Sequence, residues 1–223
     1  MHLLKKLTRS TGLTLAAAFV SAGVLAAGPQ HSEHYGDDYR AAYQQYLNAT
    51  EGGRSDSSRA LERFTELHEA NPQDPVALML MGGSQTLRGR DAWMPWNKLS
   101  HTEDGLDNME RAQNLLQTEH DDLWFEGLPV SIMVPAITGI TYVQVPSMFS
   151  RFEQGLQLLE SVMAHPRRKQ AQPEAMTSIY RYTVEAALEV DDRALAEEAM
   201  GALEQLAIDD VHTQQARRLM EEE

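Results

Sequence analysis

Apolar and polar positions follow the period of an amphipathic α-helix over most of the chain from Glu33 onward. Ala, Leu, Glu, Gln, Arg and Met dominate these segments, and Val, Ile and Thr are sparse outside one stretch. Straight-chain residues lose little rotamer freedom in a helix. Residues 55–58 offer N-caps, and residues 71–75 close one helix and open the next, with Pro75 in its first turn. The pattern predicts an all-α protein.

Small and apolar residues return at one spacing in three of the predicted helices. The spacing is 0, +4 and +7, and the three sets are Ala60-Phe64-Leu67, Gly105-Met109-Ala112 and Gly155-Leu159-Val162. Pro72 follows the first set at +12. Between the first two sets, Gly82 stands where two helices of a hairpin can approach closely because a side chain is absent. Gly89 stands where we expect a turn after the helix that carries Gly82.

This order of a small residue, an aromatic residue, a further small position and a closing proline resembles the second helix of a tetratricopeptide repeat (TPR). Leu67 departs from that pattern because it is large. The resemblance covers roughly residues 33–206 and is strongest over residues 60–112. It implies a right-handed stack of about four helical hairpins, and it implies no activity. Residues 89–96, Gly-Arg-Asp-Ala-Trp-Met-Pro-Trp, also resemble a segment of secreted, uncharacterised bacterial TPR-like proteins.

The N-terminal residues have the layout of a secretory signal. Lys5, Lys6 and Arg9 precede an uncharged, apolar run over residues 11–27. We expect residues 1–27 to be a signal peptide cleaved after Ala26 or Ala27, and residues 28–223 to form a single domain in a bacterial periplasm or outside the cell. The alternative is an N-terminal membrane anchor, for which a run of about 17 residues is short. The chain has no Cys, which fits a periplasm, where disulfides are permitted but not required.

The chain is strongly acidic, with 19 Lys+Arg against 33 Asp+Glu and a net charge of −14. Without residues 1–27 it keeps 16 of the basic residues and all 33 acidic ones, which gives −17. A phosphate backbone or an anionic lipid surface must be met by clustered Lys and Arg. The charge therefore argues against nucleic acid and anionic membranes, and we expect an acidic surface to assist the binding of a protein partner.

Two of the three tryptophans, Trp93 and Trp96, are three residues apart and are flanked by Arg90, Asp91 and Lys98. Exposed aromatic side chains beside charges are typical of a binding hot spot. The alternative is that both rings fill the gap between consecutive hairpins, and we expect at least one ring to be buried. Proline cannot sit inside a regular helix. Pro95, between the two tryptophans, therefore predicts a break in the helix, and we expect the next helix to begin near residue 103.

Residues 127–150 form an uncharged stretch of 24 residues with three prolines, Pro129, Pro135 and Pro146. A transmembrane helix would suit this length, but the prolines and several Ser, Thr and Gln residues disfavour one. We predict an irregular apolar insertion. It either packs across the stack or exposes an apolar docking surface for a partner.

No known chemistry is apparent in the remaining motifs. The sequence has no Gly-x-Ser-x-Gly elbow, Gly-rich phosphate loop or Ser-x-x-Lys box. His31 and His34 have a metal-compatible spacing. However, they fall at the expected end of the mature chain, where chains fray, so we expect no metal.

We therefore expect a non-enzymatic protein with no cofactor, a scaffold or adaptor that binds another protein such as a transporter or envelope component. The predicted contact residues are Arg90, Asp91, Trp93, Trp96, Met133, Ile137, Tyr142 and Phe149. The alternative is a small-molecule carrier of an uptake system, with its ligand held under the insertion and lined by Met133, Ile137 and Tyr142.

Overall fold

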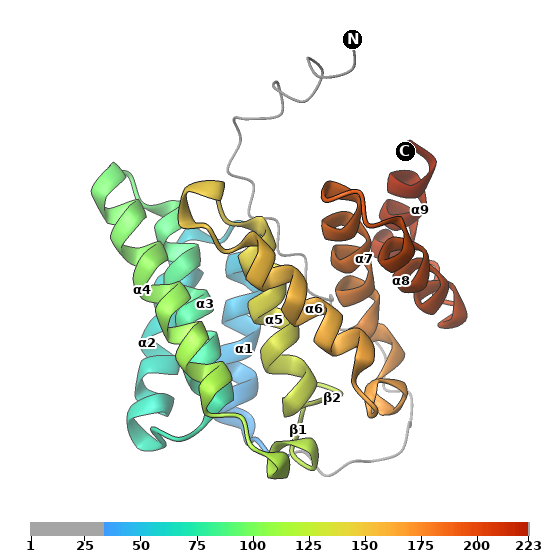
Figure 1. Ribbon diagram of the computed structural model, residues 1–223. Helices are drawn as coiled ribbons and strands as arrows, with labels where there is room; N and C mark the ends of the chain where they lie inside the picture. The colour runs from blue at the N-terminus through green and yellow to red at the C-terminus, as the bar shows by residue number, and fades with distance from the viewer. Residues whose placement is uncertain (1–33, 223) are drawn as a thin grey trace.

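The computed structural model describes residues 34–222, and this part of the chain is almost entirely helical (Figure 1). The α-helices are α1 (Asp37–Thr50), α2 (Arg54–Ala70), α3 (Pro75–Asp91), α4 (Pro95–Asn114), α5 (Val130–Gln144), α6 (Phe152–Ala164), α7 (Pro173–Glu189), α8 (Arg193–Gln205) and α9 (Val211–Glu222). The connections contain the 3-10 helices η1 (Thr118–Asp121), η2 (Ser147–Phe149) and η3 (Arg168–Gln170), and the strands β1 (Trp124–Phe125) and β2 (Leu128–Pro129). The all-α prediction is confirmed.

The predicted signal peptide, residues 1–27, and His31 lie outside the described residues. Within residues 34–222, no helix combines the length and the apolar character that crossing a bilayer requires.

Helices that follow one another along the chain pack side by side (Figure 1). α1 packs on α2, α3 on α4, α5 on α6, and α7 on α8, while α9 packs on α7 and α8. α2 also packs on α3, which joins the first two hairpins. α5 contacts α3, α4 and α7 as well as α6, so it connects the N-terminal helices to the C-terminal ones.

Aspartates cap several helices at the positions that the sequence indicates. The Asp74 carboxylate accepts the backbone N–H of Val76 at 2.9 Å, and Pro75 occupies the first turn of α3, where its missing N–H costs nothing. Asp192 accepts the N–H of Leu195 at 3.1 Å at the start of α8. Each cap satisfies a donor that a helix start leaves free. The N-caps expected at residues 55–58 are wrong, because α2 already begins at Arg54 with Gly53 as its N-cap.

The segment predicted as an irregular insertion is instead a regular helix, α5, which pairs with α6. Pro129 is its N-cap, and Pro146 follows its last turn, so two of the three prolines occupy positions that helices tolerate. Pro135 lies inside the helix. The segment is uncharged because 12 of its 15 helical residues are buried. A helix that is apolar all round belongs in a core.

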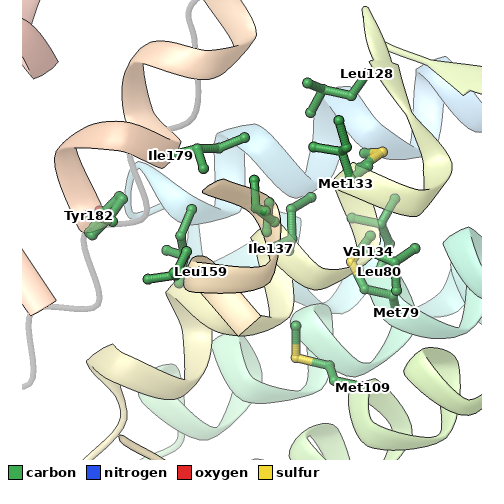
Figure 2. Packing of buried hydrophobic residues seen from close by; sticks show 14 of the residues in the cluster. Met79, Leu80, Met109, Leu128, Met133, Val134, Ile137, Leu159, Ile179 and Tyr182 are labelled. Atoms are coloured by element: carbon green, nitrogen blue, oxygen red, sulfur yellow. The ribbon is translucent and has the colours of Figure 1, made fainter. Parts of the chain in front are cut away.

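Figure 2 shows how side chains from several helices meet around α5. Met133, Val134 and Ile137 of α5 lie among Met79 and Leu80 of α3, Leu159 of α6 and Ile179 of α7, and all of these are buried. The three repeat sets are buried too, apart from Leu67, which is partly buried. The core therefore runs through the molecule along α5.

Two pairs of glycines allow helices to touch backbone to backbone. Gly82 of α3 faces Gly105 of α4, and Gly139 of α5 faces Gly155 of α6. In each pair, a Cβ added to one glycine would lie within 3.0 Å of the carbonyl oxygen of the other. The prediction for Gly82 is confirmed. The prediction for Gly89 is wrong, because this residue is buried within the last turn of α3, against Thr102 of α4.

Candidate functional site

Both tryptophans of the α3–α4 turn are exposed, Trp93 to 89% and Trp96 to 64%. Met94 and Leu99 beside them are exposed as well. We call these four residues the tryptophan surface. The expectation that at least one ring is buried is wrong, and so is the expectation that the two rings fill a gap between hairpins.

The geometry of α4 explains this exposure. α4 begins at Pro95 rather than near residue 103, because Pro95 sits in the first turn, where proline is tolerated. Gly89, in the last turn of α3, already lies against Lys98 and Thr102. The turn of α4 before Lys98 therefore extends past the end of α3, at the upper left of Figure 1. Within residues 34–222, no helix covers its apolar side chains.

The side chains of Arg90 and Asp91, which were predicted to contact a partner, pair with each other and are mostly buried, although Asp91 also lines the cleft described below. Their side chains form an ion pair at 2.8 Å and are 11% and 14% exposed. Arg90 donates to the carbonyl oxygens of Ala49 at 2.8 Å and Thr50 at 3.4 Å, and Asp91 accepts the Ser57 hydroxyl at 3.1 Å. The guanidinium thus adds donors to carbonyls in the last turn of α1, where the Ala49 carbonyl also accepts the N–H of Gly52. The pair ties α1 and α2 to α3, so both residues have a structural role, and their contact with a partner stays a prediction.

An open cleft of about 290 Å³ adjoins the tryptophan surface. It is lined by Arg54, Ser57, Ser58, Arg88, Asp91, Ala92, Trp93, Met94, Asn97 and His101. These residues come from the start of α2, the end of α3 and the start of α4. The cleft and the tryptophan surface share Trp93 and Met94, so a bound molecule could contact both.

The cleft carries two cations that the described part of the chain leaves unpaired. Arg54 and Arg88 form no ion pair or side-chain hydrogen bond within residues 34–222, whereas the Asp91 carboxylate is already paired with Arg90. The cleft is therefore locally positive. We expected an acidic surface to assist binding, but this cleft is positive, so that expectation does not apply here.

The four predicted contact residues of the 127–150 segment lie elsewhere. Met133, Ile137 and Tyr142 are fully buried, and Phe149 is partly buried against the core. The Tyr142 hydroxyl donates to the carbonyl oxygen of Leu106 at 3.0 Å. Burial raises the pKa of Tyr142 to about 12, although the nearby Arg151 guanidinium opposes the shift. These residues are structural, which corrects the prediction of an apolar docking surface.

The same packing concerns the alternative prediction, a small-molecule carrier whose ligand cavity is lined by Met133, Ile137 and Tyr142. Met133 and Ile137 contact neighbouring core side chains (Figure 2), and Gly139 brings the backbones of α5 and α6 together. The side chains that would line the cavity thus fill the interior themselves.

A cluster of tyrosines around Asp74 is the other notable polar group. The Tyr35 hydroxyl donates to Asp74 at 3.1 Å, and the Tyr39 hydroxyl donates to the second carboxylate oxygen. Burial and the adjacent carboxylate raise the pKa of both tyrosines. Asp74 also caps α3, so the cluster ties Tyr35 and the first turn of α1 to that helix. Among the described residues, no group of three or more metal-ligating side chains could hold a metal ion.

Sequence reasoning missed Arg54, Arg88, Met94 and Leu99. Arg54 and Arg88 stand 34 positions apart, and only the packing of α2 on α3 brings them to one cleft. Comparison of the chain with protein-family models, curated proteins and solved structures gives no match. The site is therefore interpreted from its own geometry.

Proposed function

We propose that the protein is a non-enzymatic scaffold or adaptor that binds another protein through the tryptophan surface and the adjoining cleft. The observation that carries the proposal is the exposure of Trp93 and Trp96 at the start of α4, which no other helix of the described residues covers. Tryptophan supplies a large contact area, and clustered aromatic side chains next to arginine are typical of hot spots. Grouped exposed apolar side chains mark interaction sites, whereas single ones need no explanation.

The proposal includes a TPR-like right-handed stack in which α1–α2, α3–α4, α5–α6 and α7–α8 are the hairpins and α9 is the terminal cap. Its support is the recurrence of one contact. Gly82 faces Gly105 in the second hairpin, and Gly139 faces Gly155 in the third. Gly105 and Gly155 each open a set with spacing 0, +4 and +7. Equivalent contacts at equivalent places are what an internal repeat produces.

The proposed location is a bacterial periplasm or the cell exterior, reached through a signal peptide at residues 1–27. A transporter or envelope component is the proposed kind of partner. The basis is the basic and apolar order of the N-terminal residues.

The test of this function is capture of a partner by tagged protein from envelope extracts of the source organism, followed by reconstitution with the purified partner. We expect Trp93→Ala combined with Trp96→Ala to abolish binding while helical circular dichroism stays unchanged. The matched control is Met148→Ala with Val190→Ala, which removes two exposed apolar side chains elsewhere. Full binding by the tryptophan variant would refute the proposal.

A further inference from the structure

We infer that the partner docks through an acidic segment, with a carboxylate bound between Arg54 and Arg88 in the cleft and its neighbouring apolar side chains on the tryptophan surface. This inference rests on the proposed function and names the chemistry of the partner. The occupant is an extended stretch of another protein in which Asp or Glu stands beside large apolar residues.

The first argument is the pairing of charges in an acidic chain. With 33 carboxylates against 19 cations, an arginine finds an acidic neighbour easily, and most described arginines do. Near the cleft, Arg59 pairs with Asp56 at 3.7 Å and Arg90 with Asp91 at 2.8 Å. Arg54 and Arg88 have no acidic partner among residues 34–222, although they line one cleft. Two free guanidinium groups in one concave site favour an anion that comes from another molecule.

The second argument is the match between donors and ligand. Guanidinium groups bind carboxylates through two parallel hydrogen bonds, which are shorter and stronger than neutral ones. Ser58 and Asn97 line the same cleft and add neutral polar groups. Trp93 and Met94 belong to both the cleft and the tryptophan surface. A segment with a carboxylate next to an apolar side chain would satisfy both at once.

The third argument concerns the class of the occupant. Tryptophan and arginine together also suit a membrane interface, but a chain with net charge −14 is repelled by an anionic bilayer over a broad surface. A peptide segment contacts only the local positive site, and the repulsion over longer distances is screened by salt. The concave shape of the cleft also suits a side chain better than a flat lipid surface. A protein segment is therefore the occupant that the charges favour.

The test is fluorescence anisotropy with the full chain and two labelled peptides, Gly-Phe-Asp-Leu-Glu-Phe-Gly and its amide counterpart Gly-Phe-Asn-Leu-Gln-Phe-Gly. We expect the acidic peptide to bind at least tenfold more tightly at low salt, and this preference to fall as salt is added. Arg54→Gln combined with Arg88→Gln is expected to remove the preference. The control is Arg63→Gln, an exposed arginine of α2 that does not line the cleft and forms no ion pair within residues 34–222.

Each other result overturns the inference in a distinguishable way. Equal binding of both peptides that still depends on Trp93 and Trp96 would refute the carboxylate site and leave the proposed function standing. Binding that survives the double tryptophan variant would count against both. Failure of the acidic peptide to bind at 1 mM would also overturn the inference. Preferential binding to phosphatidylglycerol vesicles would overturn it as well. Self-association of the chain, measured by light scattering and abolished in the arginine variant, would do the same.

Discussion

A Cβ atom added to Gly82 would lie 2.6 Å from the carbonyl oxygen of Gly105, and one added to Gly105 would lie 2.5 Å from that of Gly82. The two glycines thus set the distance between α3 and α4. The same hairpin ends in the exposed turn that carries Trp93 and Trp96. The α3–α4 contact therefore places the candidate site.

We predict that Gly82→Ala lowers the free energy of unfolding by about 1–3 kcal/mol, because the methyl group meets backbone that cannot move aside. Chemical denaturation monitored by circular dichroism measures this change. The matched control is Gly201→Ala in α8, where an added Cβ has nothing within 4 Å. That substitution is expected to stabilise by about 0.5–1 kcal/mol, since alanine is the better helix former. Equal effects of the two changes would contradict the close approach.

We predict that Arg90→Ala destabilises the protein by about 2–4 kcal/mol, because it leaves the largely buried Asp91 carboxylate without its cation and removes the hydrogen bonds to the carbonyls at the end of α1. Arg193→Ala is the comparison, since Arg193 and Glu197 form an exposed pair. Its loss should cost less than about 1 kcal/mol. A small effect at Arg90 would mean that its side chain is available to a partner after all.

Local signals are sufficient to predict the helical character of the chain and the start of α3. Caps such as Asp74 and Asp192, and buried sets such as Gly155-Leu159-Val162, depend on residues a few positions apart. α5 was misjudged because Pro135 disfavours a helix by about 3 kcal/mol in isolation. Burial of most of the helix outweighs that cost. Tertiary packing therefore overrides the local effect of Pro135.

The candidate site could be predicted only in part, because exposure depends on where a neighbouring helix ends. The pair Trp93 and Trp96 was a candidate from its spacing, but no local pattern tells that α4 extends past α3. Arg90 and Arg88 are two positions apart on one helix, yet one is internal and the other lines the cleft. Which role each takes is decided by α1 and α2.

We predict that Asp210→Ala destabilises the protein by about 1 kcal/mol at pH 7, because Asp210 accepts the N–H of Thr213 at 2.8 Å at the start of α9. Partial burial alone would raise the pKa of Asp210, but hydrogen bonds from Thr213 and Thr177 lower it below the ordinary 3.8. A lowered folded pKa means that this stabilisation is complete above about pH 3.8 and is lost as the pH falls further.

Asp210→Asn separates the two contributions, since the amide oxygen can still accept the hydrogen bond but carries no charge. The difference in unfolding free energy between wild type and this variant should shrink as the pH is lowered from 5 to 3. A difference that stays constant over that range would show that the charge contributes nothing.

We predict the opposite pH dependence at Glu126. Burial raises the pKa of this carboxyl above the ordinary 4.5, although Arg40 partly opposes the shift. A pKa that is raised in the folded state means that folding favours the protonated form. Glu126 therefore contributes most to stability below about pH 4.5, and this contribution is lost as the pH rises through the pKa of the folded state. Glu126→Gln should therefore stabilise the protein at pH 7 by less than about 1 kcal/mol, since the group is partly solvated. It should give no gain at pH 4.

The backbone at this position allows a second, pH-independent test. Glu126 and Gly127 form the two-residue turn between β1 and β2, with positive φ angles of 48° and 76°. Asparagine tolerates such angles better than glutamate, and Asn-Gly is the favoured pair in turns of this type. Glu126→Asn should therefore be more stable than Glu126→Gln at every pH, as measured by thermal unfolding at pH 4 and pH 7. If the two variants are equally stable, the positive φ angle costs nothing, and any gain at pH 7 comes from the charge alone.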